Sequence, residues 1–204
     1  MNNIQNIIFD LGGVILDVDY NLTRTAFEKL GVTHFDEMYS QTTADQLFQK
    51  LETGRISEKD FHAELNRCTG LHLSAQEINQ AWNAMLLTFR EDSLRFLDEL
   101  SPRYNLFLLS NTNHIHLKAL QKIFHERKRD KSFEEYFTKA FYSCDIGLRK
   151  PDAVCYQWVL ETLSIDPHHT LFIDDSTKNI EAANNEGMQT ILLEKGMTIE
   201  NLNL

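Results

Sequence analysis

The stretch Ile7-Ile8-Phe9-Asp10-Leu11-Gly12-Gly13 decides the fold, because it is a short apolar run that ends on an aspartate and a glycine turn. Such a run, bounded by polar residues, is typical of a fully buried strand. Two later runs have the same form: residues 106–109 precede Ser110-Asn111, and residues 171–173 precede Asp174-Asp175. Parallel strands would bring these ends to one edge of a sheet, where open α/β folds bind ligands. We therefore expect one pocket built from residues far apart in the sequence.

The composition limits the kinds of partner that the chain can bind. Its 204 residues are 42% hydrophobic and 25% charged, which is ordinary for a globular protein of one domain or one domain with an insertion. The formal net charge of −10 argues against a nucleic-acid groove and against an anionic membrane surface. An anionic substrate would need a local cation or a metal. The sequence does not indicate an oligomeric state.

Targeting and cysteine signals point to the cytoplasm. No apolar stretch reaches membrane-spanning length, and the N-terminus has no basic segment followed by an apolar core. The three cysteines, Cys68, Cys144 and Cys155, have no paired spacing. We expect reduced thiols in a cytoplasmic protein.

The pattern of helices and strands predicts an α/β core with an inserted helical region. Residues 19–89 contain one helical pattern after another, including a capping box at Ser74-Ala75-Gln76-Glu77. From residue 90 helices and strands alternate to the end, with strands expected at 106–110, 139–143, 170–174 and 189–193. This alternation predicts a Rossmann-like parallel sheet with helices on both faces. The expected division is a core of residues 1–18 and 90–204 and a small helical cap of residues 19–89.

Each polar residue at a strand end also has an ordinary structural explanation. Asp10 could be a turn former, Ser110-Asn111 a side-chain turn, and Asp174-Asp175 the cap of the next helix. Lys150 could simply be the extended residue that precedes Pro151. These explanations are independent of one another, whereas a shared functional site accounts for all four positions at once.

Four segments resemble, in order and spacing, the motifs of the haloacid dehalogenase superfamily. They are FDLGGV at 9–14, LSNT at 109–112, GLRKPD at 147–152 and IDDSTKN at 173–179. The resemblance covers essentially the whole chain, and the helical region 19–89 is similar to that superfamily's small helical cap. The chain looks most like the bacterial sugar-1-phosphate phosphatases, including those that act on alpha-D-glucose 1-phosphate. The phosphatase domain of soluble epoxide hydrolase is also similar.

The resemblance implies a phosphoric monoester hydrolase that depends on Mg²⁺. Asp10 would attack phosphorus and form an aspartyl-phosphate, which divides one difficult displacement into two easier ones. Magnesium prefers oxygen ligands. The implied metal ligands are the Asp10 and Asp175 side chains, the Gly12 carbonyl, and Asp174 either directly or through water.

The same resemblance assigns the phosphate-binding groups. Lys150 would neutralise the nucleophile and the transferring phosphoryl group. Ser110 and the backbone N–H groups that follow it, from Asn111 onward, would hold the phosphoryl oxygens near a helix N-terminus. Arg55, in a turn of the cap, is a candidate substrate contact. Asn179 could orient Asp174 or Lys150.

One position departs from the superfamily pattern. Most of its phosphatases carry a second aspartate two residues after the nucleophile, where it acts as general acid and base; here that residue is Gly12. A substrate with a good leaving group, such as a sugar 1-phosphate, would need this group least. Asp17 or Asp19 could replace it, although the sequence favours the simpler interpretation of both as solvated residues at the entry to the cap.

Three other functions follow from the missing acid or from the family. The protein could bind a phosphorylated ligand with little turnover. A phosphomutase is less favoured, because mutases of this build use the residue that is missing. Haloacid dehalogenation is disfavoured. Without a bound metal, the carboxylates of Asp174 and Asp175 would repel an anionic haloacid.

The histidines give no clear metal signal. Neither His114-x-His116 nor His168-His169 has zinc-site spacing with a third ligand nearby in the sequence. The expected partner is therefore a small phosphorylated metabolite bound with Mg²⁺.

Overall fold

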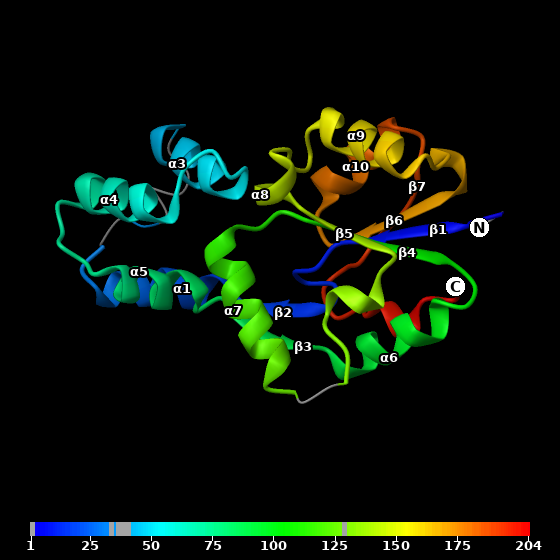
Figure 1. The fold of residues 1–204 in the computed structure, drawn as a ribbon, viewed down its shortest axis with the longest axis horizontal. Helices are drawn as coiled ribbons and strands as arrows, with labels where there is room; N and C mark the ends of the chain where they lie inside the picture. The colour runs from blue at the N-terminus through cyan, green and yellow to red at the C-terminus, as the bar shows by residue number, and fades with distance from the viewer. Residues whose placement is uncertain (1–2, 33–34, 36–41, 128–129) are drawn as a thin grey trace.

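The structure is a computed structural model that describes residues 3–32, 35, 42–127 and 130–204. Its centre is a five-stranded parallel sheet in the order β5-β4-β1-β6-β7 (Figure 1). The strands are β1 (Asn6–Phe9), β4 (Asn105–Ser110), β5 (Lys139–Tyr142), β6 (Thr170–Asp174) and β7 (Gln189–Leu192). The expected parallel α/β sheet is confirmed.

Helices cover both faces of this sheet because successive strand residues point to opposite sides. On one face, Ile7 and Phe9 pack with helices α6 (Glu91–Leu100) and α7 (His114–His125). On the other face, Ile8 packs with α9 (Ala153–Leu163) and α10 (Thr177–Asn185). The three central strands β1, β4 and β6 are therefore buried on both sides, which explains their apolar sequences. The shorter elements are α8 (Ser143–Ile146), η1 (Glu134–Tyr136), η2 (Pro167–His169) and η3 (Ile199–Asn201).

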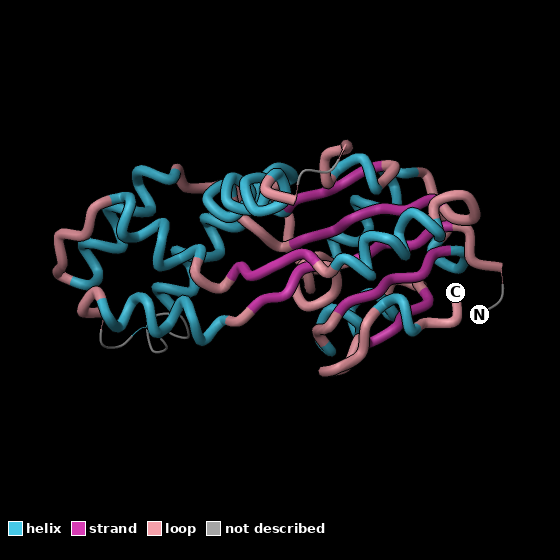
Figure 2. Tube along the Cα trace, turned by 90° about the horizontal axis from the view of Figure 1, so that it is seen from below, coloured by secondary structure: helices cyan, strands magenta, loops and turns pink. Residues whose placement is uncertain are grey.

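Residues 19–89 are hereafter called the helical segment. Its described part lies beyond one end of the sheet, away from the two chain termini (Figures 1 and 2). It contains α1 (Tyr20–Lys29), α3 (Thr42–Glu52), α4 (Glu58–Thr69) and α5 (Ala75–Asn83). These helices have an apolar core of their own, in which Phe48 stacks on Trp82 with 4.8 Å between ring centroids. Ile115, on α7, joins this core from the sheet side.

Two short antiparallel strands connect the helical segment to the sheet. β2 (Leu16–Val18) leaves the core and β3 (Leu86–Phe89) returns to it, with Val18 opposite Leu86. Helical periodicity predicted a helix up to Phe89, and this was wrong for residues 86–89. These four residues extend instead because the backbone of β2 lies beside them and pairs with them.

Local signals set the helix ends. Asp19 accepts a hydrogen bond from the Asn21 backbone N–H and so starts α1. The predicted capping box is present: Ser74 and Glu77 each accept a hydrogen bond from the other's backbone N–H.

In the part of the chain that the structure describes, no helix is both long and apolar enough to cross a membrane.

Candidate active site

The Lys150 ammonium lies between two carboxylates at the carboxyl end of the sheet. Its Nζ donates to Asp10 Oδ1 at 2.7 Å and to Asp174 Oδ2 at 2.6 Å. Asp10 follows the central strand β1, and Asp174 ends the neighbouring β6. A parallel register places the two side by side, and the Asp10 N–H donates to the Ile173 carbonyl at 2.9 Å. The structure thus brings together three residues that the sequence separates widely.

Asn111 fixes the backbone that carries the lysine. Its Nδ2 donates to the Lys150 carbonyl at 2.8 Å, and its Oδ1 accepts from the Lys150 N–H at 2.9 Å. The next residue, Thr112, exchanges two 2.9 Å hydrogen bonds with the Ser143 hydroxyl. The Asn111 side chain therefore positions the Lys150 backbone, which leaves the Asn111 backbone N–H as the candidate phosphate contact.

Asp174 is wholly buried, and its carboxylate accepts four hydrogen bonds from three nitrogen atoms. Besides Lys150, the Ser176 N–H donates to Oδ1 at 2.8 Å, and Asn179 Nδ2 lies 3.0 Å from both oxygens. A carboxylate has about four acceptor positions. Asp174 is thus better suited to holding Lys150 and Asn179 than to binding a metal directly.

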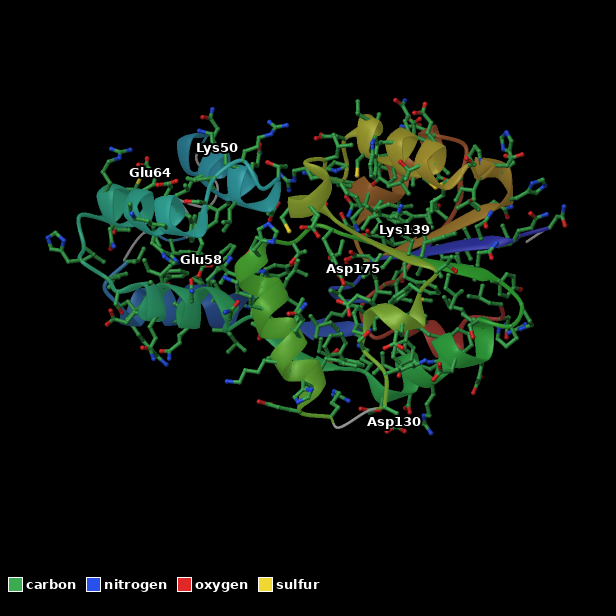
Figure 3. The ribbon with its side chains drawn as sticks, viewed as in Figure 1. Lys50, Glu58, Glu64, Asp130, Lys139 and Asp175 are labelled. Atoms are coloured by element: carbon green, nitrogen blue, oxygen red, sulfur yellow. The ribbon has the colours of Figure 1, made fainter. Side chains whose placement is uncertain are left out.

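Gly13 makes room for Asp175. A Cβ built on Gly13 would lie 2.0 Å from Asp175 Oδ2, and Gly13 has a φ of +72°. Only glycine satisfies both the backbone conformation and this close approach. Figure 3 shows Asp175 at the end of the sheet that faces the helical segment, on which Lys50, Glu58 and Glu64 are labelled.

Charges in this cluster favour a bound cation. One oxygen each of Asp10, Asp174 and Asp175 lie within 4.8 Å of one another, so carboxylates outnumber the single ammonium. Burial raises the pKa of Asp10 to about 7, although Lys150 lowers it. Burial and then Asp174 also raise the pKa of Asp175. Burial alone would lower the pKa of Lys150. The carboxylates of Asp10 and Asp174 have the larger effect, so the pKa of Lys150 is raised. An all-oxygen cluster with surplus negative charge suits a hard divalent cation.

A cavity of about 440 Å³ opens beside this cluster, between the sheet and the helical segment. From the sheet side, Asp10, Gly12, Ser110, Lys150 and Asp175 line it, together with Asn111 and Asn179. The helical segment and the strand pair β2–β3 supply the opposite wall, which includes Tyr20, Glu52, Trp82, Met85 and Leu86. The cavity therefore has an acidic wall on the sheet side and a partly aromatic wall on the opposite side.

The model of the haloacid dehalogenase-like hydrolases matches residues 4–187. The chain belongs to the haloacid dehalogenase-like hydrolase family. A D-ribitol-5-phosphate phosphatase of Bacteroides thetaiotaomicron is 34% identical over 197 residues, which are 95% of this chain and 93% of that one. Bifunctional epoxide hydrolase 2 of Rattus norvegicus is 37% identical over 59 residues, which are 29% of this chain and 11% of that one.

A solved structure has a closely similar fold. It is a haloacid dehalogenase family enzyme from Bacteroides thetaiotaomicron in complex with magnesium and inorganic phosphate, with a TM-score of 0.87 at 33% identity. The match covers 95% of this chain and 96% of that one. The hydrolase described here is a phosphoric monoester hydrolase with Mg²⁺ as its cofactor. The family, the enzyme class and the cofactor expected from the motifs are confirmed.

The structure does not bring Arg55 to the cavity of this hydrolase. Arg55 lines two other hollows, one with Lys50 and one with His114. The preceding Gly54 packs on the Cys144 backbone, where a Cβ would lie 2.3 Å from the carbonyl oxygen. That contact turns the loop toward α8. Besides Lys150, Arg149 and Lys178 line the cavity. The Arg149 Nη2 lies 3.1 Å from Glu52 Oε2.

The two aspartates considered as substitute acids have structural partners. The Arg90 Nε lies 2.7 Å from Asp17 Oδ1, and Asp19 caps α1. Neither lines the cavity. Arg90 also donates to the carbonyls of Gly13 and Val14, at 2.9 and 3.1 Å. Asp17 therefore helps to hold the turn that follows β1 through Arg90.

His116 follows the predicted phosphate-binding turn, where the sequence favours an exposed residue at a helix start; the structure instead buries it in the cavity wall. Its Nε2 lies 3.2 Å from the Trp82 carbonyl, and its ring stacks on Trp82 with 5.0 Å between centroids. A carbonyl only accepts, so Nε2 carries the proton and Nδ1 is an acceptor. Burial lowers the pKa of His116 to about 4. Only the packing of α5 on α7 reveals this contact, since a histidine at a helix start carries no signal for it.

Proposed function

We propose that this hydrolase cleaves the phosphate ester of a small phosphorylated metabolite through an aspartyl-phosphate on Asp10, with a sugar 1-phosphate as the preferred substrate. The observation that carries the proposal is the position of Asp10. It lines a cavity large enough for a small metabolite, together with Lys150 and Ser110. A carboxylate beside an ammonium at the base of such a cavity suits attack on phosphorus.

The residues divide the reaction into two displacements. Asp10 attacks phosphorus, and the bond between phosphorus and the metabolite oxygen breaks. Water then attacks the same phosphorus, which releases inorganic phosphate and restores the Asp10 carboxylate. Lys150, 2.7 Å from Asp10 Oδ1, offsets the repulsion between two anions. Ser110 would hold a phosphoryl oxygen in both steps.

The acidic cluster fits Mg²⁺, and we assign its ligands from the hydrogen bonds around each carboxylate. Asp10 and Asp175 are the proposed side-chain ligands and the Gly12 carbonyl the backbone ligand. Asp174 acts indirectly, because its oxygens already accept from Lys150, Ser176 and Asn179. When bound, the cation supplies positive charge next to the phosphoryl oxygens.

The helical segment is the proposed cap domain, residues 19–89, over a core of residues 1–18 and 90–204. Trp82, Met85 and Tyr20 give the cavity an apolar wall on that side. Such a wall excludes water and selects the leaving group. With its reduced cysteines and metabolite substrate, the enzyme is proposed to work in the cytoplasm.

Gly12 supports the choice of a sugar 1-phosphate. No side chain at this position can protonate the leaving oxygen, and Asp17 is held by Arg90. An anomeric hydroxyl is more acidic than a simple alcohol, so its departure needs the least protonation. A phosphorylated polyol is the second candidate, because the similar Bacteroides thetaiotaomicron enzyme is a D-ribitol-5-phosphate phosphatase.

Phosphate release from a panel of metabolites with Mg²⁺ tests these assignments. The panel contains hexose 1-phosphates, hexose 6-phosphates and D-ribitol 5-phosphate. We expect the highest kcat/KM with a 1-phosphate, loss of turnover in Asp10→Asn, and a phosphoryl mass increment on the wild-type peptide that contains Asp10 after acid quenching. A preference for the ribitol ester would favour the second candidate.

Two other outcomes would replace the proposal. Binding without phosphate release would identify a phosphate-ligand-binding protein, and an isomerised sugar phosphate would identify a phosphomutase.

A further inference from the structure

A second group of metal-ligating side chains lies outside the catalytic cavity. His114, the first residue of α7, meets Cys144 and Asp145 of α8, about thirty positions further along the chain. The Cys144 Sγ lies 3.8 Å from His114 Nδ1 and 4.0 Å from Asp145 Oδ1. His114 Nδ1 lies 3.8 Å from Asp145 Oδ1. None of the three residues lines the cavity that contains Asp10.

The spacing of the three atoms is close to that of a tetrahedral zinc site. Zinc bonds of ~2.0 to ~2.3 Å place neighbouring ligand atoms about 3.3 to 3.6 Å apart. The observed separations exceed this by a few tenths of an ångström, which side-chain rotations can close. At 3.8 Å, the His114 nitrogen and the Asp145 oxygen are too far apart for a hydrogen bond to organise them. A cation between them would contact all three atoms.

The donor set separates this group from the catalytic cluster. One sulfur, one imidazole nitrogen and one carboxylate oxygen suit a borderline-soft ion such as Zn²⁺. Mg²⁺ takes oxygen ligands in octahedral geometry and has little affinity for a thiol. Each cation would therefore choose a different cluster of this chain.

The surroundings hold the ligands and leave an entry route. Cys144 is buried, and its carbonyl packs against Gly54 of the helical segment, whereas the His114 and Asp145 side chains are more than half exposed. His114 and Asp145 border a hollow of about 690 Å³ that Gly54 and Ser57 also line. An ion can enter from this side with water as its fourth ligand. A loaded site would lie at the contact between the helical segment and the sheet.

We propose that His114, Cys144 and Asp145 form a second cation site of this hydrolase, with three protein ligands for Zn²⁺ and a water molecule in the fourth position. Binding removes the proton from the Cys144 thiol, which passes to the solvent, and involves no change of oxidation state. The proposal does not depend on the identity of the phosphorylated substrate.

Cobalt titration of the full chain tests the site, because tetrahedral Co²⁺ with a thiolate ligand absorbs in the near ultraviolet and in the visible. Excess Mg²⁺ is present to occupy the acidic cluster. We expect both absorptions to saturate at one equivalent of Co²⁺ and to disappear when Zn²⁺ is added. Cys144→Ser should abolish the near-ultraviolet band, and His114→Ala should weaken Co²⁺ binding at least tenfold.

Two controls separate this site from the rest of the molecule. Cys68→Ser removes an exposed thiol on α4 and should leave both absorptions unchanged. Asp175→Asn should abolish Mg²⁺-dependent phosphate release and keep the cobalt spectrum, so failure of the proposed function would leave the second site intact. Circular dichroism shows whether each variant folds.

A cobalt spectrum that persists in folded Cys144→Ser would overturn the assignment. So would a folded wild-type protein without thiolate absorption at millimolar Co²⁺. A zinc-dependent rise in melting temperature, present in the wild type and absent in Cys144→Ser and His114→Ala, provides independent support.

Discussion

Lys150 and Asp174 form an ion pair that is almost completely removed from water. The Nζ–Oδ2 distance is 2.6 Å, and the two side chains are 1% and 0% exposed. Burying two opposite charges gives little net stability, but removing one of them leaves the other without compensation. The pair therefore links the stability of the sheet edge to the lysine proposed to act beside Asp10.

Lys150→Met tests this link. We expect a loss of about 3 kcal/mol or more in the free energy of unfolding, because Asp174 remains buried without its cation. Turnover should fall roughly a hundred- to a thousandfold or further, since the charge that faces Asp10 is lost. Urea unfolding and phosphate release measure the two effects. Lys118→Met is the matched control, because Lys118 pairs with Glu58 at the surface and should cost under about 1 kcal/mol.

Gly13→Ala should inactivate the enzyme by displacing Asp175. The added Cβ would overlap Asp175 Oδ2. Gly70→Ala is the control, because Gly70 has nearly the same φ, +71°, with open space around its Cβ. Both variants pay about 1 kcal/mol for the left-handed backbone, but only Gly13→Ala should lose Mg²⁺-dependent phosphate release. Equal activities of Gly13→Ala and Gly70→Ala would show that phosphate release does not depend on the present position of the Asp175 carboxylate.

Gly12→Asp should restore a general acid at the position where the family usually has one. Among the described residues, only Val18 Cγ2 comes within 4 Å of the added Cβ, at 3.3 Å. General acid catalysis contributes about a hundred- to ten-thousandfold. We expect hydrolysis of D-ribitol 5-phosphate to improve at least roughly tenfold relative to p-nitrophenyl phosphate, whose leaving group needs no proton. An unchanged ratio would indicate that another group already supplies the proton.

His116 should make the stability of the protein depend on pH. Its pKa is lowered to about 4 from a usual value of 6.5, mainly by burial. As the pH falls below 6.5, the unfolded chain binds a proton that the folded chain does not, so stability falls. Between pH 7 and pH 5 this residue should contribute a loss of about 2 kcal/mol. Urea unfolding of His116→Gln should show a correspondingly smaller loss, whereas His72→Gln, at an exposed position, should behave as the wild type.

Mg²⁺ should stabilise the folded protein through Asp175. A cation that binds only the folded state raises the melting temperature in proportion to the logarithm of its concentration. We expect a rise with millimolar Mg²⁺ and its reversal by a chelator. Asp175→Asn should have a higher melting temperature than the wild type without Mg²⁺, because it removes a negative charge beside Asp174, and should respond weakly to the ion. A full response in this variant would contradict the ligand assignment.

The sequence predicted the sheet and the acidic cluster well, because both depend on local patterns. Buried strands are continuous apolar runs, and a parallel register brings Asp10 and Asp174 together without further information. The strand Leu86–Phe89 was not predicted, since its apolar residues fit a helix equally well until β2 lies beside it. Pairing between segments distant in the sequence decides such cases.

The remaining site residues depend on packing that local patterns do not contain. His116 enters the cavity wall because α7 packs on α5, and Arg55 leaves it because Gly54 contacts Cys144. His114 contacts Cys144 only because the fold brings the start of α7 next to α8, and no spacing in the sequence indicates this contact. The motifs identified the groups at strand ends, whereas contacts between helices decided which other side chains surround them.

The antiparallel pair of β2 and β3 lets the chain leave the core at Val18 and return at Leu86, directly opposite. An insertion attached at two adjacent points can be lengthened, shortened or exchanged in a single genetic event without moving the strands behind it. Chimaeras that graft a relative's residues between these two positions would therefore keep the reaction and acquire the donor's choice of metabolite.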